Sequence, residues 1–415
     1  MAERTVVERR GPDGPDASED HAQGAGVTAV VLLLSSLTVM ANATIAPALP
    51  GLAAAFEGTP RIDALAGLAL SLPSLSIVLT AGLFGLAADR LDRRALLASL
   101  CVLYGGAGAS GAVAPGLWSL LGGRVLLGVA VAGVMTLVTQ MAGELWRGPA
   151  RERFLGLQAA ATSAGGIAFL LAGGFLAEAS WRGPFLVYLV AVPLAPIAYL
   201  ALRRPLADRD RAPSRAHAAV PWRAVLEVGS LAFLAMVAFY LIPTRLPFRM
   251  AALGDASPTL SGAAIACVTL ASVPASLTFP RIRTRFLPKT IFGGALGAMA
   301  GGLALIGVAD GPAAIFAGCL LVGAGLGFVV PNQVSWLMAR VGDDARGRAA
   351  GLLTMAIFAG QFAAPLFAAA LEPLVGLGAT FRIAGIGVLT MASVCVLTRG
   401  SIPMPRNHLR EGGVA

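Results

Sequence analysis

The sequence predicts an all-α membrane protein with twelve transmembrane helices, arranged as two parallel six-helix repeats. Three observations lead to this fold class. Of 415 residues, 57% are hydrophobic and only 13% are charged, which is too apolar for a soluble chain of this length. Apolar runs of membrane-crossing length recur along the chain. The two halves of the chain also repeat each other at one constant offset.

Twelve apolar runs are long enough to cross a bilayer as helices. Six lie in a predicted N-terminal half (26–203), at 26–48, 66–87, 95–114, 118–142, 154–178 and 184–203. Six lie in a predicted C-terminal half (224–398), at 226–246, 259–280, 289–309, 312–338, 346–371 and 377–398. We expect polar, disordered cytoplasmic tails at 1–25 and 399–415 and a cytoplasmic linker at 204–223.

The lysine and arginine residues are distributed unevenly around these runs. With the N-terminus inside, 25 of them fall in inner segments, and the outer loops hold only Arg61, Arg182, Arg245, Arg249 and Arg382. This bias predicts a multi-pass protein of the cell's inner (plasma) membrane with both termini in the cytoplasm. The basic residues are scattered in short loops, so the net charge of +9 indicates membrane orientation and no nucleic-acid partner.

The repeat has an offset of 195 residues and holds across several loops and helices. The matched pairs are Arg90 with Arg285, Arg94 with Lys289, Gly128 with Gly323, and Gly156 with Gly351. Because each half has an even number of spans, the second copy enters the membrane in the same direction as the first. Substrate sites in such folds lie near the midplane, between the halves.

A charged loop separates the second and third runs, with the sequence Gly85-Leu-Ala-Ala-Asp89-Arg90-Leu-Asp92-Arg93-Arg94. It resembles the signature loop of the major facilitator superfamily, and the resemblance covers about residues 25–400. Asp92 stands where the family usually has glycine, and aspartate is among the few residues that tolerate left-handed backbone geometry.

The resemblance implies a transporter similar to the drug/proton antiporter branches of the family. It implies a conformational gate at Gly85, Asp89, Arg90, Arg93 and Arg94. The Asp89 carboxylate is expected to face the positive N-terminal end of the eleventh helix, which begins near Arg346 and Arg348. Such a contact, made in one state and broken in the other, would bias a rocking motion.

Arg124 is the only charge that we place well inside a span, where an arginine is costly and is a functional candidate by default. Together with Gly128 it resembles the family's fourth-helix pattern Arg-x-x-x-Gly, which implies a role in ion coupling or substrate handling. The alternative is a structural arginine whose guanidinium is satisfied by backbone carbonyls and water.

Proton coupling needs a group that is alternately protonated, and no carboxylate lies deep in a predicted span. Glu178 and Glu372, near helix ends, are the best-placed candidates. The alternative is an interfacial carboxylate that pairs with Arg182 or with solvent. The family's antiporter signature is also incomplete, because Phe169 and Leu170 stand where those branches have Gly-Pro.

Polar or aromatic residues in the helices that the family uses around its pathway are cavity candidates. Besides Arg124 they are Asn42, Thr136, Gln140, Tyr240, Asn332 and Gln361. Each could instead form an interhelical hydrogen bond. The remaining lining is apolar, which suits a hydrophobic or amphipathic substrate better than a sugar.

Several classes of protein are not supported. The four cysteines lack metal-ligand spacing, and the run Gly323-Ala-Gly-Leu-Gly327 lacks the Lys-Ser/Thr ending of a phosphate loop. We therefore expect no metal, cofactor, nucleotide or enzymatic activity. The favoured function is secondary transport, with efflux of a small hydrophobic or amphipathic compound by proton antiport. Metabolite uptake, an ion-independent facilitator and a non-transporting sensor are alternatives, and a monomer would suffice.

Overall fold

The computed structural model describes residues 16–202 and 220–397. All regular secondary structure in these ranges is helical. Twelve helical segments of this part are long and apolar enough to cross a membrane, so the predicted fold class is confirmed. The predicted C-terminal tail, most of the linker and the first fifteen residues lie outside the described ranges.

The N-terminal half contributes six spans. The first consists of α1 (Asp16–Ala43), the 3-10 turn η1 (Ala46–Ala48) and α2 (Leu49–Ala55). Four single helices follow, α3 (Ile62–Arg90), α4 (Arg93–Val113), α5 (Leu117–Leu145) and α6 (Gly148–Ala179). The sixth span is broken into α7 (Gly183–Leu186), the 3-10 turn η2 (Val187–Val190) and α8 (Ala191–Ala201).

The C-terminal half contributes six helices, each of which is one span. They are α9 (Trp222–Ala252), α10 (Pro258–Arg283), α11 (Pro288–Val308), α12 (Pro312–Met338), α13 (Arg346–Val375) and α14 (Leu377–Leu397). Proline opens α10, α11 and α12, a position where its missing N–H has no intrahelical partner to lose.

The structure corrects the interpretation of Asp92. Its backbone φ is −62°, outside the left-handed region, and its side chain accepts a hydrogen bond from the backbone N–H of Arg94. Asp92 is therefore the N-cap of α4, a role in which aspartate is strongly preferred. It does not replace a left-handed glycine.

Several helices extend beyond the apolar runs, because a helix can continue past the hydrocarbon region into water. α1 begins at Asp16, so this helix includes residues 16–25 of the segment predicted as a tail. α9 continues to Ala252, which places Arg245 and Arg249 within the helix and not in an outer loop. Arg382 likewise lies within α14.

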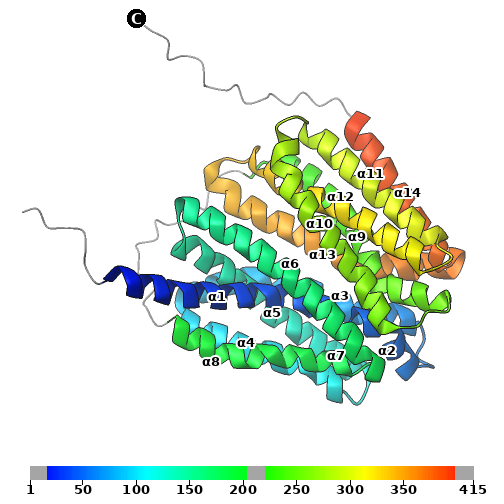
Figure 1. Cartoon of the computed structure of the whole chain (residues 1–415), viewed down its shortest axis with the longest axis horizontal. Coiled ribbons are helices and arrows are strands. Elements are labelled where there is room, and N and C mark those ends of the chain that lie inside the picture. The colour runs from blue at the N-terminus through cyan, green and yellow to red at the C-terminus, as the bar shows by residue number, and fades with distance from the viewer. Residues whose placement is uncertain (1–15, 203–219, 398–415) are drawn as a thin grey trace, which may run out of the picture.

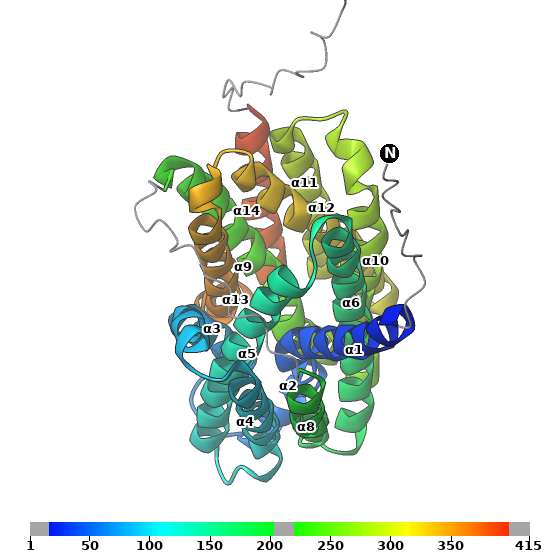
Figure 2. The same ribbon diagram turned by 90° about the vertical axis from the view of Figure 1, so that its left-hand side faces the viewer.

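The two halves lie side by side as separate bundles (Figure 1). They pack together along two contacts between long helices, α3 with α13 and α6 with α10, which we call the two seams. Figure 2 shows the α3–α13 seam on the left and the α6–α10 seam on the right.

We name the two ends of the bundle by what lies there. The arginine-rich end carries the turns from α3 to α4, α5 to α6, α10 to α11 and α12 to α13. The closed end, where α3 and α10 begin and α6 and α13 end, holds close contacts between the halves. A Cβ added at Gly174 of α6 would lie 2.8 Å from the Pro258 carbonyl oxygen of α10, and one at Gly67 would lie 2.9 Å from Cβ of Pro365.

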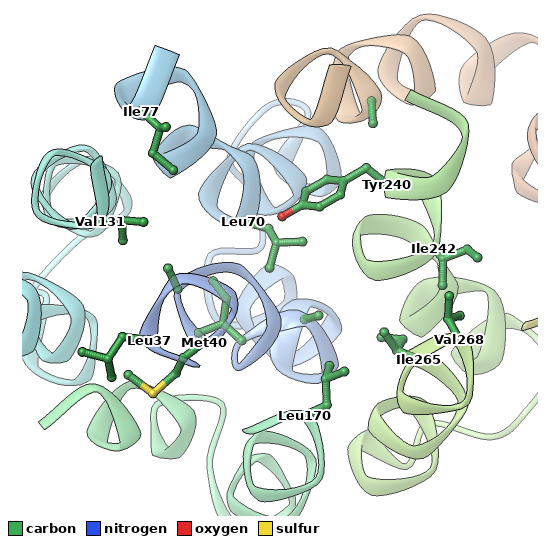
Figure 3. Packing of buried hydrophobic residues seen from close by; sticks show 14 of the residues in the cluster. Leu37, Met40, Leu70, Ile77, Val131, Leu170, Tyr240, Ile242, Ile265 and Val268 are labelled. Carbon is green, nitrogen blue, oxygen red and sulfur yellow. The ribbon is translucent and has the colours of Figure 1, made fainter. Parts of the chain in front are cut away.

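The buried hydrophobic core continues from one half into the other. Figure 3 shows α1, α3 and α5 contributing Met40, Leu70 and Val131 from the N-terminal half, with Ile242 and Val268 from α9 and α10 on the other side. The midplane region between the halves is therefore mostly apolar, with a few polar side chains set into it.

Candidate functional site between the two halves

Polar side chains from four helices lie around the middle of the interface between the halves. The Ser74 hydroxyl of α3 donates to Oε1 of Gln361 on α13, at 2.9 Å. Nδ2 of Asn42 on α1 donates to the Ser74 hydroxyl, at 3.4 Å. Tyr240 of α9 points its ring toward Leu70 of the other half (Figure 3). This central cluster, formed by Asn42, Ser74, Tyr240 and Gln361, spans the two halves.

Two atoms of the central cluster lack hydrogen-bond partners in the structure. These are Oδ1 of Asn42 and the hydroxyl of Tyr240, and both atoms are buried. A buried polar group without a partner costs about 1–3 kcal/mol, and native proteins keep few of them. Each can be satisfied by a ligand or a water molecule that enters between the halves, so the cluster is a candidate binding site.

Arg124 of α5 lies elsewhere, inside the N-terminal half, with only 1% of its surface exposed. Its Nε donates to the Ala69 carbonyl of α3 at 2.8 Å, its Nη1 donates to the Tyr188 hydroxyl of η2 at 3.0 Å, and its Nη2 donates to the Ala41 carbonyl of α1. The Tyr188 hydroxyl also donates to Ala41, at 2.9 Å. This geometry corresponds to the structural alternative, because the guanidinium joins four spans of one half.

Gly128, one turn after Arg124, is a packing position. A Cβ there would lie 2.6 Å from both Cα and the carbonyl oxygen of Pro73 on α3. Its repeat partner is Gly323 on α12. A Cβ added at Gly323 would lie 2.3 Å from the Val268 carbonyl oxygen of α10. Both copies of the repeat therefore use glycine where two helices of one half approach closely.

The other cavity candidates do not join the central cluster through the hydrogen bonds of the structure. Thr136 donates to the Ala132 carbonyl of its own helix, at 2.8 Å, and reaches the Ala81 carbonyl of α3 at 3.5 Å. Asn332, which is 1% exposed, donates to the Pro288 carbonyl at the start of α11, at 2.9 Å. Oε1 of Gln140 is buried and unpartnered. Asn332 thus fits the alternative of an interhelical hydrogen bond, whereas the shorter bond of Thr136 lies within its own helix.

Glu178 makes a contact between the halves at the closed end. Its Oε1 accepts a hydrogen bond from the Ser257 hydroxyl at 2.7 Å and from the backbone N–H of Thr259 at 3.1 Å. Ser257 is the N-cap of α10, so the carboxylate of one half binds the positive N-terminal end of a helix in the other. The alternative of a pair with Arg182 is not what the structure has, because Arg182 donates to the carbonyls of Ala112 and Ala114.

A buried ion pair that was not predicted lies at the same end. Nε of Arg245 on α9 is 3.0 Å from Oε1 of Glu372 on α13, and Nη1 donates to the Asp63 carbonyl of α3 at 2.9 Å. From the sequence we place Arg245 in an outer loop because the predicted run 226–246 ends one residue later. The apolar residues that continue the helix past this run, Phe248 and Met250, are the signal that could place Arg245 inside it.

The arginine-rich end carries ion pairs within each half. Arg93 pairs with Glu144 of α5 at 2.8 Å, and Glu227 of α9 pairs with Arg340 at 2.8 Å and with Lys289 at 3.7 Å. The side chain of Asp89 is outside those that the structure describes, so its contact with the start of α13 stays a prediction. Gly85 has open space at its Cβ position, and Arg90 is exposed.

A cavity of about 390 Å³ opens between α1, α5 and α6, toward the arginine-rich end. Its lining combines hydroxyl and amide groups with apolar side chains and includes no charged residue: Ser35, Thr38, Met135, Val138, Thr139, Leu155, Gln158, Ala159, Thr162 and Ser163. Polar side chains inside a membrane span face the bundle interior or a water-filled space. This volume is within the range of small-molecule pockets.

Two six-helix bundles with parallel repeats and polar groups between them define a membrane transporter of the two-repeat type. The chain belongs to the Major Facilitator Superfamily, whose model matches residues 31–365 and 228–412.

Among individual proteins, the class C tetracycline resistance protein of Escherichia coli is 33% identical over 169 residues. This match covers 38% of the chain and 40% of that protein, so it spans less than half of the relative's length.

Solved transporters share the fold. The nucleoside transporter NupG superposes with a TM-score of 0.73 at 12% identity, over 90% of this chain and 99% of that one. A bacterial homolog of the human lysosomal transporter Spinster gives 0.70 at 15% identity, over 89% and 95%. The human organic anion transporter MFSD10 gives 0.64 at 20% identity, over 90% and 99%. At these identities the likeness shows the fold alone.

Proposed function

We propose that this transporter exports a small hydrophobic or amphipathic compound across the plasma membrane in exchange for protons, and that it works as a monomer. The proposal rests on the central cluster. Its buried polar atoms without hydrogen-bond partners lie near the midplane and are surrounded by apolar side chains. A ligand that is mostly apolar but has one or two hydrogen-bonding groups complements such a site.

The arginine-rich end is the cytoplasmic end in this proposal. The segments that the helix order places at this end hold the excess of lysine and arginine, and loops of this kind remain in the cytoplasm. The closed end then faces outward, and substrate enters from the cytoplasm toward the cavity between α1, α5 and α6. Because the residues lining this cavity are uncharged, the proposed substrate does not need a net charge.

Alternating access requires the contacts at the closed end to break when that end opens. The Glu178 contact with the start of α10 is suited to this role, because it joins the halves through hydrogen bonds that water can replace. Asp89 is the proposed counterpart at the arginine-rich end, facing the start of α13. Formation of one contact while the other is broken would give the rocking motion two defined states.

The partial match to a tetracycline resistance protein supports export of an antibiotic-like compound. Uptake of a metabolite, with or without ions, is the second candidate. It is favoured by Phe169 and Leu170, which interrupt the antiporter signature, and it agrees with the nucleoside and organic anion transporters among the proteins of similar fold.

Flux in inverted membrane vesicles tests the proposal. A panel that contains tetracycline, other antibiotics and lipophilic cations is assayed with an imposed pH gradient, and again after the gradient is collapsed. Proton-linked export predicts uptake that is lost on collapse. Uptake that equilibrates without a gradient would indicate a facilitator. Binding without flux would indicate a sensor, and movement of nucleosides or organic anions alone would favour the second candidate.

A further inference from the structure

Arg245 is a buried cation at the boundary between the halves. Only 1% of its side chain is exposed, against 19% for its partner Glu372. The guanidinium carbon is 3.9 Å from the Cβ position of Gly67 on α3, and Nη1 donates to the Asp63 carbonyl of that helix. Arg245 therefore contacts both its ion-pair partner in the C-terminal half and the backbone of the N-terminal half.

The hydrogen bonding of this pair is incomplete. Nε of Arg245 and Oε1 of Glu372 are 3.0 Å apart, but the N–H does not point at the oxygen, so the contact is an ion pair without a hydrogen bond. Nη2 of Arg245 is also buried without a partner. The Glu372 charge is thus the main compensation for this cation, because removing one member of a buried pair leaves the other charge uncompensated.

We propose that Glu372 is the proton-coupling carboxylate of the transporter and that Arg245 converts its protonation state into opening of the closed end. This inference rests on the proton exchange proposed above. With Glu372 ionised, Arg245 can remain buried between α9, α13 and α3, and the end stays closed. With Glu372 protonated, the buried guanidinium loses its counter-charge, and separation of the halves lets water solvate it.

The proton follows a balanced path in this scheme. The Glu372 carboxylate accepts one proton from water when the closed end is open, and Arg245 stays positively charged throughout. On closure the carboxyl group returns the proton to water in the space between the halves, and the ion pair forms again. Because protonation and opening favour each other, each one shifts the equilibrium of the other by the same factor.

Among residues 16–202 and 220–397, few other charged groups lie around the pair. The second carboxylate within electrostatic reach of both members is Asp63, which is on the first turn of α3 and exposed. Arg249, one turn further along α9, donates to the carbonyls of Gly307 and Ala309. The Glu178 carboxylate also joins the halves at this end, so its titration must be separated from that of Glu372.

A distance measurement in the absence of substrate tests the inference. Spin labels are attached at Ala55→Cys on α2 and Ala256→Cys before α10, two exposed sites in opposite halves at the closed end, in a background without the four native cysteines. The full-length protein is reconstituted in lipid. Pulsed electron paramagnetic resonance then records the distance distribution from about pH 8 to about pH 5, a range over which buried carboxyl groups can titrate.

We expect a longer-distance population that grows as the pH falls in the wild type. Glu372→Gln is expected to show this population at every pH. The double variant Arg245→Gln/Glu372→Gln has neither charge, so it should fold and show no dependence on pH. Glu178→Gln is the matched control, because it should favour opening at all pH values and still respond to pH.

The inference is overturned if the Glu372→Gln distances titrate as the wild type does, or if the wild-type distances do not respond to pH. Its failure can be distinguished from failure of the proposed function. Proton-driven flux without pH-dependent opening would leave export standing and assign coupling to another group. pH-dependent opening without proton-driven flux would overturn the antiport and reduce the pair to a pH-sensitive structural contact.

Discussion

Replacing Arg124 distinguishes a structural arginine from a transport residue. Arg124→Ala removes three hydrogen bonds, to Ala69, Ala41 and Tyr188. At about 1 kcal/mol for each bond inside a membrane bundle, the free energy of unfolding should fall by about 3 kcal/mol. The coupling role considered from the sequence would leave folding intact, whereas the geometry leads us to expect destabilisation as well as loss of transport.

The assay is thermal unfolding of the purified protein in detergent. For a six-helix half of this size, a loss of about 3 kcal/mol in the free energy of unfolding lowers the midpoint of thermal unfolding by roughly 6–12 °C. Tyr188→Phe provides a graded comparison, because it removes one acceptor of Arg124 and the hydrogen bond from the Tyr188 hydroxyl to Ala41. It should cost about 1–2 kcal/mol. A wild-type midpoint for Arg124→Ala, together with abolished flux, would refute the structural role and assign Arg124 to transport.

Three further predictions follow from single contacts. Glu178→Gln removes the charge that interacts with the start of α10, an interaction of about 0.5–1 kcal/mol. The fraction of molecules in which the closed end is open should therefore rise roughly two- to fivefold. An unchanged distance distribution would argue against this contact. Gly128→Ala places a Cβ 2.6 Å from the Pro73 backbone and should cost about 1–3 kcal/mol in thermal unfolding, whereas Gly122→Ala, with open space around it, should be neutral. Tyr240→Phe removes a buried hydroxyl without a partner, so stability should be kept while the affinity for a transported compound falls up to about tenfold; unchanged affinity would remove Tyr240 from the site.

The number and order of the spans could be predicted because they depend on local composition. A stretch of about twenty apolar residues has to cover the hydrocarbon core wherever it occurs in the chain. The ends of the helices were less predictable, since a helix continues into water without an apolar signal, as α1 does from Asp16. Asp92 is a second example. Aspartate is common both at helix N-caps and in left-handed turns, so the sequence alone did not distinguish these two conformations.

The partners of the charged residues could not be predicted, because they depend on contacts far apart in the sequence. Tyr188 carries no motif, yet its hydroxyl accepts a hydrogen bond from Arg124 across 64 positions. Glu178 meets Ser257 in the other half across 79 positions. The sequence singled out Asn42, Tyr240 and Gln361 as cavity candidates, and in the structure they lie in the central cluster between the halves. That they line a substrate path stays a prediction.

The prolines of α9 explain why the buried ion pair was missed. Pro243 and Pro247 flank Arg245 within the helix, and proline next to a charge normally indicates the end of a span. The helix continues because neighbouring helices can satisfy the backbone groups that proline leaves free. A buried arginine between two prolines is therefore better interpreted as a functional candidate than as a loop residue.

The most direct test of the account is to hold the closed end shut and measure transport. Glu178→Cys and Ser257→Cys, on opposite halves, are bridged by a short bifunctional thiol reagent that reductant releases. A bridge within one half, between Gly116→Cys and Arg182→Cys, is the control. Flux of a compound that the unbridged protein transports should stop with the first bridge, return on reduction, and persist with the control. Full flux with the closed end bridged would contradict alternating access between the two halves.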